Sequence, residues 1–409
     1  MDFDKKIILK KRTPTRLSGG VRLASSKSES NRLLLIQALA NEAVEISNLS
    51  TARDTQTMRG LLSEKSAVWD VKDAGTTMRF LTAYLATKGE DQTITGTDRM
   101  KQRPIAPLVE ALRTMGAKIQ YLEADGFPPL KISRIEKQLT NTLAIPGNIS
   151  SQYISALLMI APCLPSGLQI ELTSEIFSRP YIDMTLKLME QFHVGHTWAG
   201  NTVSIEPQSY TAGSCKVESD WSGASYWYSF MALNQEKGHL FLPNLKAYST
   251  QGDQQIMTLM KPLGVITQFV NGGVRITQKK IESFEQEIDF RDCPDLAQTV
   301  MVVAAVKGIR LTMTGLESLR IKETDRIKAM RSELAKLGAL LSDYGNAWTL
   351  EPSSALPQEI EISTYEDHRM AMAFAPLCHL MDVTIEDPLV VNKSYPEFWE
   401  EMRKVGRWG

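Results

Sequence analysis

The feature that most constrains the fold is the fourfold recurrence of one local pattern. A helix-like amphipathic stretch ends in a turn that contains glycine, and a short strand-like segment follows. The four glycines are Gly116, Gly195, Gly264 and Gly338, separated by 79, 69 and 74 residues. Glycine just beyond a helix end readily adopts the left-handed conformation that closes the helix. Because self-similarity at a near-constant spacing indicates repeated units, the sequence predicts an α/β protein built from modules of about 70–80 residues.

Length and charge limit the classes of protein that fit. The chain has 409 residues, enough for two or three folding units at about 150 residues each. Its apolar fraction of 43% is typical of a globular protein. The 46 basic and 47 acidic side chains give a formal net charge of −1, which argues against a dedicated nucleic-acid or membrane-surface binder. We expect neither partner, although this balance still permits a local basic site.

The cysteines and the N-terminal residues indicate compartment and chemistry. The four cysteines are Cys163, Cys215, Cys293 and Cys378. Because no C-x-x-C pair is present, we expect neither a metal site nor a disulfide framework. The charged N-terminal residues lack the apolar core of a signal peptide, and the longest apolar runs are far shorter than the ~20 residues of a membrane span. We expect a soluble, cytoplasmic protein without a metal.

Several polar or basic segments directly precede helix-like apolar runs. They are Ser25–Arg32, Asp73–Arg79, Asn148–Gln152, Ser178–Pro180, Cys293–Asp295 and Glu366–Arg369. Helix capping, at about 1 kcal/mol per cap, explains any single start. It does not explain the cations in first turns, because these oppose the helix dipole by roughly 0.3–1 kcal/mol. Those cations are Lys27, Arg32, Arg79, Arg179 and Arg369. Free backbone N–H groups, the dipole and a cation together favour an anion, so we predict a site for a polyanionic small molecule.

Two further basic segments are compatible with this site but do not establish it. Arg99 and Arg103 are four residues apart, and taken alone they are better explained by a solvated loop. Lys322 and Arg326 share a helix face, with Glu323 beside them. An exposed helix with ion pairs between neighbouring turns is the simpler alternative for this second segment.

Taken in order, these segments resemble the 5-enolpyruvylshikimate-3-phosphate (EPSP) synthase family, also called 3-phosphoshikimate 1-carboxyvinyltransferase. The resemblance covers essentially the whole chain. It rests on the motifs Ser26-Lys-Ser-x-Ser-Asn-Arg32, Ala74-Gly-Thr-x-Met-Arg79, Arg99-Met-x-x-Arg-Pro104, Ser150-Ser-Gln152, Lys322-Glu-Thr-Asp-Arg326 and Asp367-His-Arg-Met370. Each motif is weak alone, and their combination is specific.

The resemblance implies a two-domain, inside-out α/β barrel. Each domain would consist of three βαβαββ units around a pseudo-threefold axis, which would account for the repeat. The implied domains are residues 1–24 plus 247–409, and residues 25–246, with chain crossings near Ala24 and Lys246. Family members close these domains on substrate, so the resemblance also implies an active site in the interdomain cleft. It further implies a monomer.

The resemblance implies a reaction of two anionic substrates without a cofactor. The family transfers the enolpyruvyl group of phosphoenolpyruvate to the 5-hydroxyl of shikimate 3-phosphate and releases phosphate. The reaction proceeds by addition–elimination through a tetrahedral intermediate and belongs to the shikimate pathway, which leads to chorismate and aromatic amino acids. The implied phosphoenolpyruvate ligands are Lys27, Gly75, Arg103, Gln152, Arg326, Arg369 and Lys393. The implied shikimate 3-phosphate ligands are Ser28, Arg32, Ser150, Ser151, Gln152, Ser178, Tyr181, Asp295, Ser318 and Lys322.

Two proton transfers need residues from the matched motifs. A base must accept the 5-hydroxyl proton, and an acid must protonate the methylene carbon of phosphoenolpyruvate. Asp295, Glu323 and Lys27 are the implied catalytic residues, and the sequence does not assign each transfer. Our hypothesis places Asp295 at the 5-hydroxyl, with Glu323 and Lys27 sharing the proton transfers at the enolpyruvyl group.

The sequence departs from the family pattern at a few places. Asp73 replaces the usual Asn, Phe80 replaces the usual Pro, and Ser318 replaces an Asn that contacts the shikimate phosphate. The segment between Asp54 and Asp73 is short, so we expect one strand or turn of the first unit to be trimmed. Gly75 is the family residue that leaves room for the inhibitor glyphosate, and we therefore predict glyphosate sensitivity.

Two alternatives of different kinds stay open at this point. The related UDP-N-acetylglucosamine enolpyruvyl transferases usually use a cysteine in a mobile loop, and the corresponding region from Arg99 to Arg103 has none. A binding or regulatory paralogue without turnover is suggested by Asp73 and Ser318. Release of phosphate on mixing both substrates would distinguish an enzyme from such a paralogue.

Overall fold

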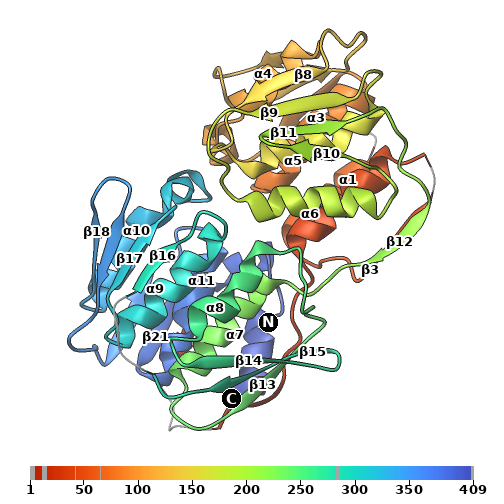
Figure 1. The fold of residues 1–409 in the computed structure, drawn as a ribbon. Coiled ribbons are helices and arrows are strands. Elements are labelled where there is room, and N and C mark those ends of the chain that lie inside the picture. The colour runs from red at the N-terminus through yellow and green to blue at the C-terminus, as the bar shows by residue number, and fades with distance from the viewer. Residues whose placement is uncertain (1–4, 12–15, 42, 65, 282–285, 407–409) are drawn as a thin grey trace. The chain divides into compact units, whose positions relative to one another are not determined.

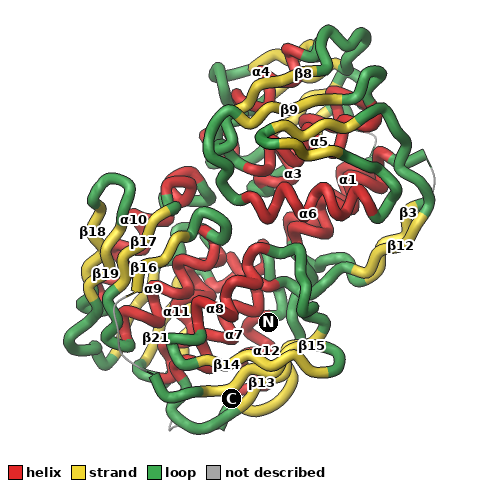
Figure 2. The backbone as a smooth tube through the Cα atoms, viewed as in Figure 1, coloured by secondary structure: helices red, strands yellow, loops and turns green. Residues whose placement is uncertain are grey.

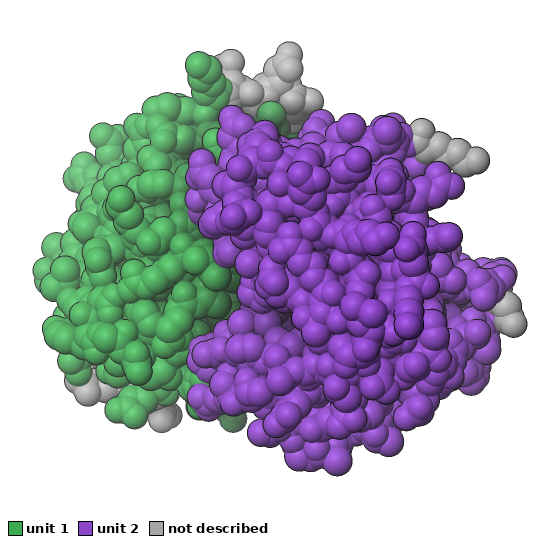
Figure 3. All heavy atoms as spheres, turned by 90° about the horizontal axis from the view of Figure 1, so that it is seen from above, with its two compact units in different colours: residues 1–25, 218–409 green, residues 26–217 purple. Residues whose placement is uncertain are grey.

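The computed structural model describes residues 5–11, 16–41, 43–64, 66–281 and 286–406. The chain divides into two compact units, coloured separately in Figure 3. Unit 1 comprises Met1–Ser25 and Glu218–Gly409, and unit 2 comprises Ser26–Val217. The first crossing lies next to the expected Ala24. The second lies between Val217 and Glu218, well before the expected position near Lys246.

Helix α7 (Trp221–Leu233) explains the earlier second crossing. It packs against strands β13 (His239–Pro243), β14 (Val265–Val270) and β15 (Gly273–Gln278), and against helix α9 (Ala297–Val306). Twelve of its thirteen residues are buried, as expected of a helix that is apolar on all sides. Its large side chains belong to the core of unit 1, so the residues that precede Lys246 fold with that unit.

Four sheets share one strand order, which confirms a fold of repeated α/β modules. In unit 2 the first of these sheets has the strand order β4 (Val68–Asp70), β5 (Gln92–Thr95), β7 (Leu130–Ser133), β6 (Lys118–Tyr121). The second has the order β8 (Thr142–Ile145), β9 (Leu168–Leu172), β11 (Thr202–Ile205), β10 (Thr197–Ala199). In unit 1 one sheet has the strand order β16 (Gln286–Asp289), β17 (Leu311–Thr314), β19 (Trp348–Glu351), β18 (Leu340–Asp343). The other has the order β2 (Ser18–Gly20), β13, β15, β14. In each sheet a parallel pair comes first, and two antiparallel pairings complete the order.

The two remaining sheets are shorter. Strands β12 (Gly213–Lys216) and β3 (Val44–Ser47) form a parallel pair in unit 2, and β1 (Lys6–Leu9), β21 (Asp382–Glu386) and β20 (Glu359–Ile362) form a sheet in unit 1. In the complete modules an antiparallel pair follows the second helix. After α2 (Arg53–Ser63), the next described strand is instead β4, which belongs to the next sheet. Among the described residues, the short segment after Asp54 therefore lacks this antiparallel pair. We expected the loss of one strand or turn from the sequence, and the described part of this segment lacks two strands.

The glycine pattern corresponds to helix ends that lead into edge strands. Helices α4 (Ala106–Thr114), α8 (Ile256–Met260) and α10 (Arg326–Lys336) are followed by Gly116, Gly264 and Gly338, all with positive φ. After α6 (Arg179–Glu190) the left-handed residue is His193, with φ of 62°, and not Gly195. The backbone bonds Ala117→Leu112, Val194→Met189 and Ala339→Leu334 span five residues at three of these ends. They are the bonds of a Schellman motif, so α6 ends as the others do, with its left-handed position two residues earlier.

The helices form the interior of each unit. In unit 2, helices α1 (Lys27–Leu39), α3 (Gly75–Lys88), α5 (Ser151–Ile160) and α6 pack against one another, and the sheets lie outside them (Figure 1). In unit 1, α7, α9 and α11 (His368–Phe374) pack together, with strands around them (Figure 2). Among the described residues, no helix has both the length and the apolar character needed to cross a membrane.

The backbone of Gly116 gives a stability prediction. Its φ is +111°, and an added Cβ would lie 2.5 Å from the Lys137 carbonyl oxygen. We expect Gly116→Ala to lower the free energy of unfolding by about 1–3 kcal/mol through strain and overlap. Gly60 lies within α2 of the same unit with no atom within 4 Å of an added Cβ, so Gly60→Ala should raise it by about 0.5–1 kcal/mol. Urea denaturation of both variants tests this, and a Gly116→Ala variant as stable as the wild type would contradict it.

Candidate active site

The predicted helix starts of unit 2 lie where the sequence placed them. Helices α1, α3, α5 and α6 begin at Lys27, Gly75, Ser151 and Arg179. The side chains of Ser26 and Ser150 cap α1 and α5 by accepting backbone N–H bonds. Each start exposes N–H groups that have no partner within the helix, and contacts between side chains bring several of these starts together.

Arg103 lies directly over the start of α3. An added Cβ at Gly75 would lie 2.6 Å from both terminal guanidinium nitrogens of Arg103. The side chain is only 7% exposed, and among the described residues it has no ion pair and its Nε has no hydrogen-bond partner. The Nε2 of Gln152 donates to Thr76 Oγ1 at 3.1 Å, which places Gln152 at the same helix start. A buried cation without a counter-charge at a helix N-terminus is an arrangement that a bound anion would complete.

Lys27 is paired with an acid that the sequence analysis did not select. Its Nζ lies 3.0 Å from Oδ2 of Asp54, which is buried in the first turn of α2. The second oxygen of Asp54 has no described partner. Thr77 donates to the Asp54 carbonyl and so joins the starts of α2 and α3. The only sequence signal for Asp54, an acid in a first helical turn, is shared by ordinary capped helices.

The extra negative charge at Asp73 is neutralised locally. Arg53 Nη2 lies 2.8 Å from Asp73 Oδ2. Because both side chains are partly solvent-exposed, the pair contributes little to stability. The positive charge of Arg53 does offset the negative charge of Asp73, which would otherwise repel an anion at this helix start.

Arg32 has a structural role that its motif did not indicate. It is 2% exposed and donates to Thr185 Oγ1, Ser155 Oγ and the carbonyls of Ser28 and Tyr181. These bonds tie α1 to α5 and α6. Burial lowers the pKa of Arg32 to about 10, so the side chain stays cationic at neutral pH. Its guanidinium lies 5.4 Å from the centre of the Phe80 ring. Phe80, which replaces the usual Pro of the family, therefore packs against Arg32.

The start of α6 differs from the prediction in one respect. Ser178 precedes the helix with a left-handed φ of 56°, and the carbonyl of Tyr181 accepts from Arg32. Arg179 was expected among the anion-binding cations. Its guanidinium carbon lies 4.5 Å from the centre of the Trp198 ring, and its Nε lies 3.7 Å from Asp183 Oδ2. Its charge therefore has partners within its own module.

In unit 1 the matched motifs meet around Arg326. This side chain is 2% exposed, and its nitrogens lie 2.8 Å from Asp295, 2.7 Å from Glu323 and 2.6 Å from Asp367. Burial alone would lower the pKa of Arg326, but the three carboxylates outweigh it and raise the pKa. Asp367 also caps α11 by accepting the Arg369 N–H. One guanidinium thus links the segments that begin α9, α10 and α11.

Asp295 is the acid that contacts most of the other predicted residues. Its oxygens lie 2.8 Å from Arg326, 2.9 Å from Arg369 and 3.6 Å from Lys322. Burial alone would raise the pKa of Asp295, but these cations outweigh it and hold the pKa well below its ordinary value. Asp295 is therefore ionised at neutral pH in the absence of substrate.

Two other predicted residues border this cluster. Lys393 Nζ lies 3.7 Å from Glu323. Ser318 belongs to the 3-10 helix η5 (Glu317–Ile321), which packs against η4 (Pro294–Leu296), the element that carries Asp295. Among the residues that the structure describes, no group of three or more His, Cys, Asp or Glu side chains is arranged to hold a metal ion.

Three residues of this cluster were missed by the sequence analysis. Ser222 Oγ donates to the buried Asp253 Oδ2 and lies 3.5 Å from Arg369 Nη2. Tyr226 OH lies 3.4 Å from Arg369 Nη1. The aromatic residues around Tyr226 are buried in the core of unit 1, but the Tyr226 hydroxyl also reaches the cluster. Asp253 is an isolated acid in the sequence, so no motif could mark it.

The modular α/β fold and the cationic helix starts describe an enzyme class that acts on small anionic substrates. Comparisons with known proteins agree. The family model described as EPSP synthase (3-phosphoshikimate 1-carboxyvinyltransferase) matches residues 11–64 and 59–402. A 3-phosphoshikimate 1-carboxyvinyltransferase of Bacteroides fragilis (strain YCH46) is 46% identical over 398 residues, covering 96% of each chain. Another, of Paraburkholderia phytofirmans, is 35% identical over 427 residues, covering 96% of this chain and 98% of the relative.

A solved structure supports the fold. The EPSP synthase from Acinetobacter baumannii superimposes with a TM-score of 0.78 and 21% identity, covering 98% of both chains. The chain belongs to the EPSP synthase family. The resemblance drawn from the motifs is thereby confirmed. The family shown is EPSP synthase and not the related UDP-N-acetylglucosamine enolpyruvyl transferases.

Asp253 gives a pH-dependent prediction. Burial raises its pKa from 3.8 to about 6, so its stabilising contribution is present below the unfolded-state pKa of about 3.9 and is lost as pH rises through about 6. Asn cannot ionise. Between pH 5 and pH 8, Asp253→Asn should therefore gain on the order of 1–2 kcal/mol of unfolding free energy relative to the wild type.

Urea denaturation at the two pH values measures this difference. Asp382→Asn is a suitable control, because hydrogen bonds from Lys10 and Lys11 lower the pKa of that carboxyl. Its difference from the wild type should stay constant over this range. Parallel pH profiles for Asp253→Asn and the wild type would contradict the prediction.

Proposed function

We propose that this protein transfers the enolpyruvyl group of phosphoenolpyruvate to the 5-hydroxyl of shikimate 3-phosphate and releases phosphate. The observation that carries the proposal is the set of buried cations at helix starts within each unit: Arg103 in unit 2, and Arg326 and Arg369 in unit 1. Two anionic substrates match this set, and the relatives are named for the transfer of a carboxyvinyl group to 3-phosphoshikimate. We further propose that the protein acts in the cytoplasm as a monomer and without a cofactor.

The substrate assignments follow the chemistry of the side chains. Guanidinium groups bind carboxylate and phosphate oxygens in a bidentate manner, and hydroxyl groups at helix starts can bind phosphate and ring hydroxyls. We assign phosphoenolpyruvate to Lys27, Gly75, Arg103, Gln152, Arg326, Arg369 and Lys393. We assign shikimate 3-phosphate to Ser28, Arg32, Ser150, Ser151, Gln152, Ser178, Tyr181, Asp295, Ser318 and Lys322. Because the chemistry needs residues of both units, we propose that it takes place in a cleft that closes on the substrates.

Asp295 is proposed as the base for the 5-hydroxyl. Without substrate, Arg369 and its neighbouring cations lower the pKa of Asp295. Substrate anions that bind these cations weaken their hold on the carboxylate and so raise its basicity. The deprotonated hydroxyl oxygen then adds to C2 of phosphoenolpyruvate while C3 gains a proton from Glu323 or Lys27. The tetrahedral intermediate next loses phosphate from C2 and a proton from C3, which restores the double bond.

A phosphate-release assay tests the function. We expect continuous release when both phosphoenolpyruvate and shikimate 3-phosphate are present, and none when either is omitted. Binding of both compounds without release would instead identify a non-catalytic paralogue and overturn the proposal.

Single-turnover kinetics test the assignment of Asp295. Because a positioned general base contributes about 10²–10⁴-fold, Asp295→Asn should slow formation of the tetrahedral intermediate by about 100-fold or more. Glu323→Gln should slow both its formation and its breakdown. Asp343→Asn removes a carboxylate of the same unit that pairs with Arg320, and this control should retain the wild-type rate. Normal intermediate formation by a folded Asp295→Asn variant would sink the assignment.

Gly75 gives a prediction about inhibition. A Cβ at this position must displace the Arg103 guanidinium, so Gly75→Ala should weaken glyphosate inhibition by about tenfold, equivalent to 1.4 kcal/mol. In the wild type, we expect glyphosate to compete with phosphoenolpyruvate. Steady-state inhibition assays measure both effects, with Gly60→Ala as the control for an added methyl group. Inhibition that is independent of phosphoenolpyruvate concentration would count against the prediction.

A further inference from the structure

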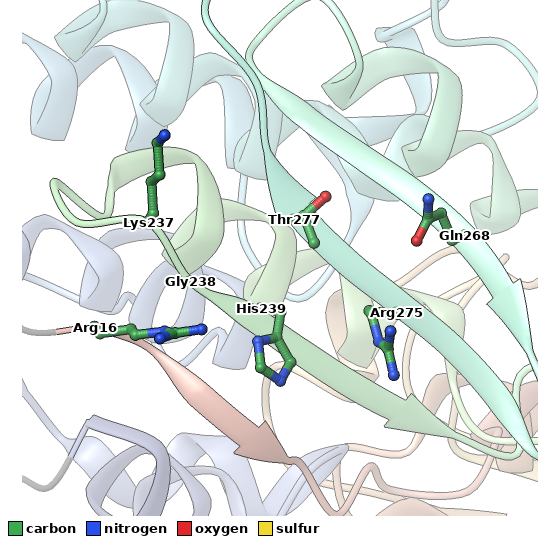
Figure 4. Close-up of a pocket in the computed structure, with 7 residues that line it drawn as sticks. All are labelled: Arg16, Lys237, Gly238, His239, Gln268, Arg275 and Thr277. Atoms are coloured by element: carbon green, nitrogen blue, oxygen red, sulfur yellow. The ribbon is translucent and has the colours of Figure 1, made fainter.

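A second basic site lies on the surface of unit 1. A cavity of about 470 Å³ is lined by Arg16, Lys237, Gly238, His239, Gln268, Arg275 and Thr277 (Figure 4). Its lining has three permanently cationic side chains and one histidine, and it has no carboxylate. None of these residues belongs to the substrate sites proposed above.

The strand register places the basic residues on one face of a sheet. On β13 and β15, His239 pairs with Thr277, and Arg275 pairs with Gln268 of β14. Alternate residues of the same strands, such as Leu240 and Ile276, are fully buried, on the side where α7 packs. Because successive strand residues point to opposite faces, the side chains of His239 and Arg275 lie on the face away from the core.

The cations in this cavity have no counter-charge. Among the residues that the structure describes, Arg16, Lys237 and Arg275 form no ion pair. In two other places in unit 1, arginines do have carboxylate partners, in the pairs Arg310–Glu351 and Arg320–Asp343. Figure 4 shows the Arg16 side chain extending toward His239, with Arg275 on the neighbouring strand. Like charges gathered without partners repel one another, and a bound anion would relieve that repulsion.

Helix α7 separates this cavity from the Arg369 cluster. Ser222 and Tyr226, which contact Arg369, lie in its N-terminal half. Lys237 and His239 follow its C-terminal residue, Leu233. A helix of 13 residues is about 20 Å long at 1.5 Å per residue. The cavity and the cluster therefore lie at opposite ends of the same helix.

We propose that this cavity is a second anion site, which binds a small molecule carrying two or more phosphate or carboxylate groups. Arg16 and Arg275 supply guanidinium groups suited to bidentate contacts with such oxygens. His239 and Gln268 add further N–H donors, and the cavity volume is that of a small-molecule site. Cations near the end of α7 could also serve only to stabilise the helix dipole. That role does not explain Arg275, which lies on β15 at the outer face of the sheet, or Arg16, which precedes β2 in the chain.

Isothermal titration calorimetry of the full chain tests the proposal with inorganic tripolyphosphate as the probe. Saturating shikimate 3-phosphate and glyphosate are both included to occupy the two proposed substrate sites. We expect binding at one site, and an Arg16→Gln/Arg275→Gln variant that binds at least about tenfold more weakly. Citrate serves as a second probe, and the tighter of the two probes assigns the ligand to the phosphates or the carboxylates.

Arg310→Gln is the matched control, since it removes an arginine of unit 1 outside the cavity, and it should leave probe affinity unchanged. Lys237→Gln provides a second variant in case the double variant folds poorly, and it should also weaken binding. The rate of phosphate release by the cavity variants should equal that of the wild type. The proposal is overturned if neither probe binds, or if both cavity variants bind as the wild type does. Because probe binding is measured without turnover, this result is independent of the proposed function.

Discussion

The guanidinium of Arg326 is almost completely buried, and its charge is stable there because carboxylates of Asp295, Glu323 and Asp367 surround it. Removing one partner of a buried ion pair costs about 3–5 kcal/mol, because the remaining charge has no compensation. The three acids come from segments that begin different helices. Their common partner therefore fixes the relative positions of those helix starts. Two of the three acids are also the proposed proton-transfer groups, so the interaction that holds this part of unit 1 together also positions its chemistry.

Unit 2 uses the same backbone arrangement with a different balance of charge. Its helix starts are joined mainly by hydrogen bonds, such as those from Gln152 to Thr76 and from Thr77 to Asp54. Arg103 is buried against one of these starts without an ion pair among the described residues. A guanidinium in that position retains its attraction for an external anion, whereas the cations around Asp295 in unit 1 are matched by acids of the protein. These two groups of helix starts therefore offer different chemistry: an uncompensated guanidinium at α3, and paired acids and bases around Asp295.

The sequence predicted the modular fold and the helix starts because both leave local patterns. Glycine after a helix and polar residues before one are required by backbone geometry, so they are legible without tertiary information. The exception at α6 shows the limit, since His193 takes the left-handed position in place of Gly195. The second chain crossing was misplaced because nothing local indicates which core buries α7. Asp54 and Asp253 were missed for the same reason: a single acid becomes part of a site only when the fold brings it to a cation.

The acids of unit 1 also affect how substrate binding and catalysis are connected. Asp295 already pairs with Arg369, Arg326 and Lys322, so under the proposed substrate assignments an anion competes with it for these cations. That competition lowers the net affinity, because part of the interaction with the anion replaces one that existed before binding. In the proposed mechanism it also frees the Asp295 carboxylate when a base is needed, since a weaker hold by the cations raises its proton affinity. In the proposed mechanism, binding at these three cations therefore works by exchanging one anionic partner, Asp295, for another, the substrate.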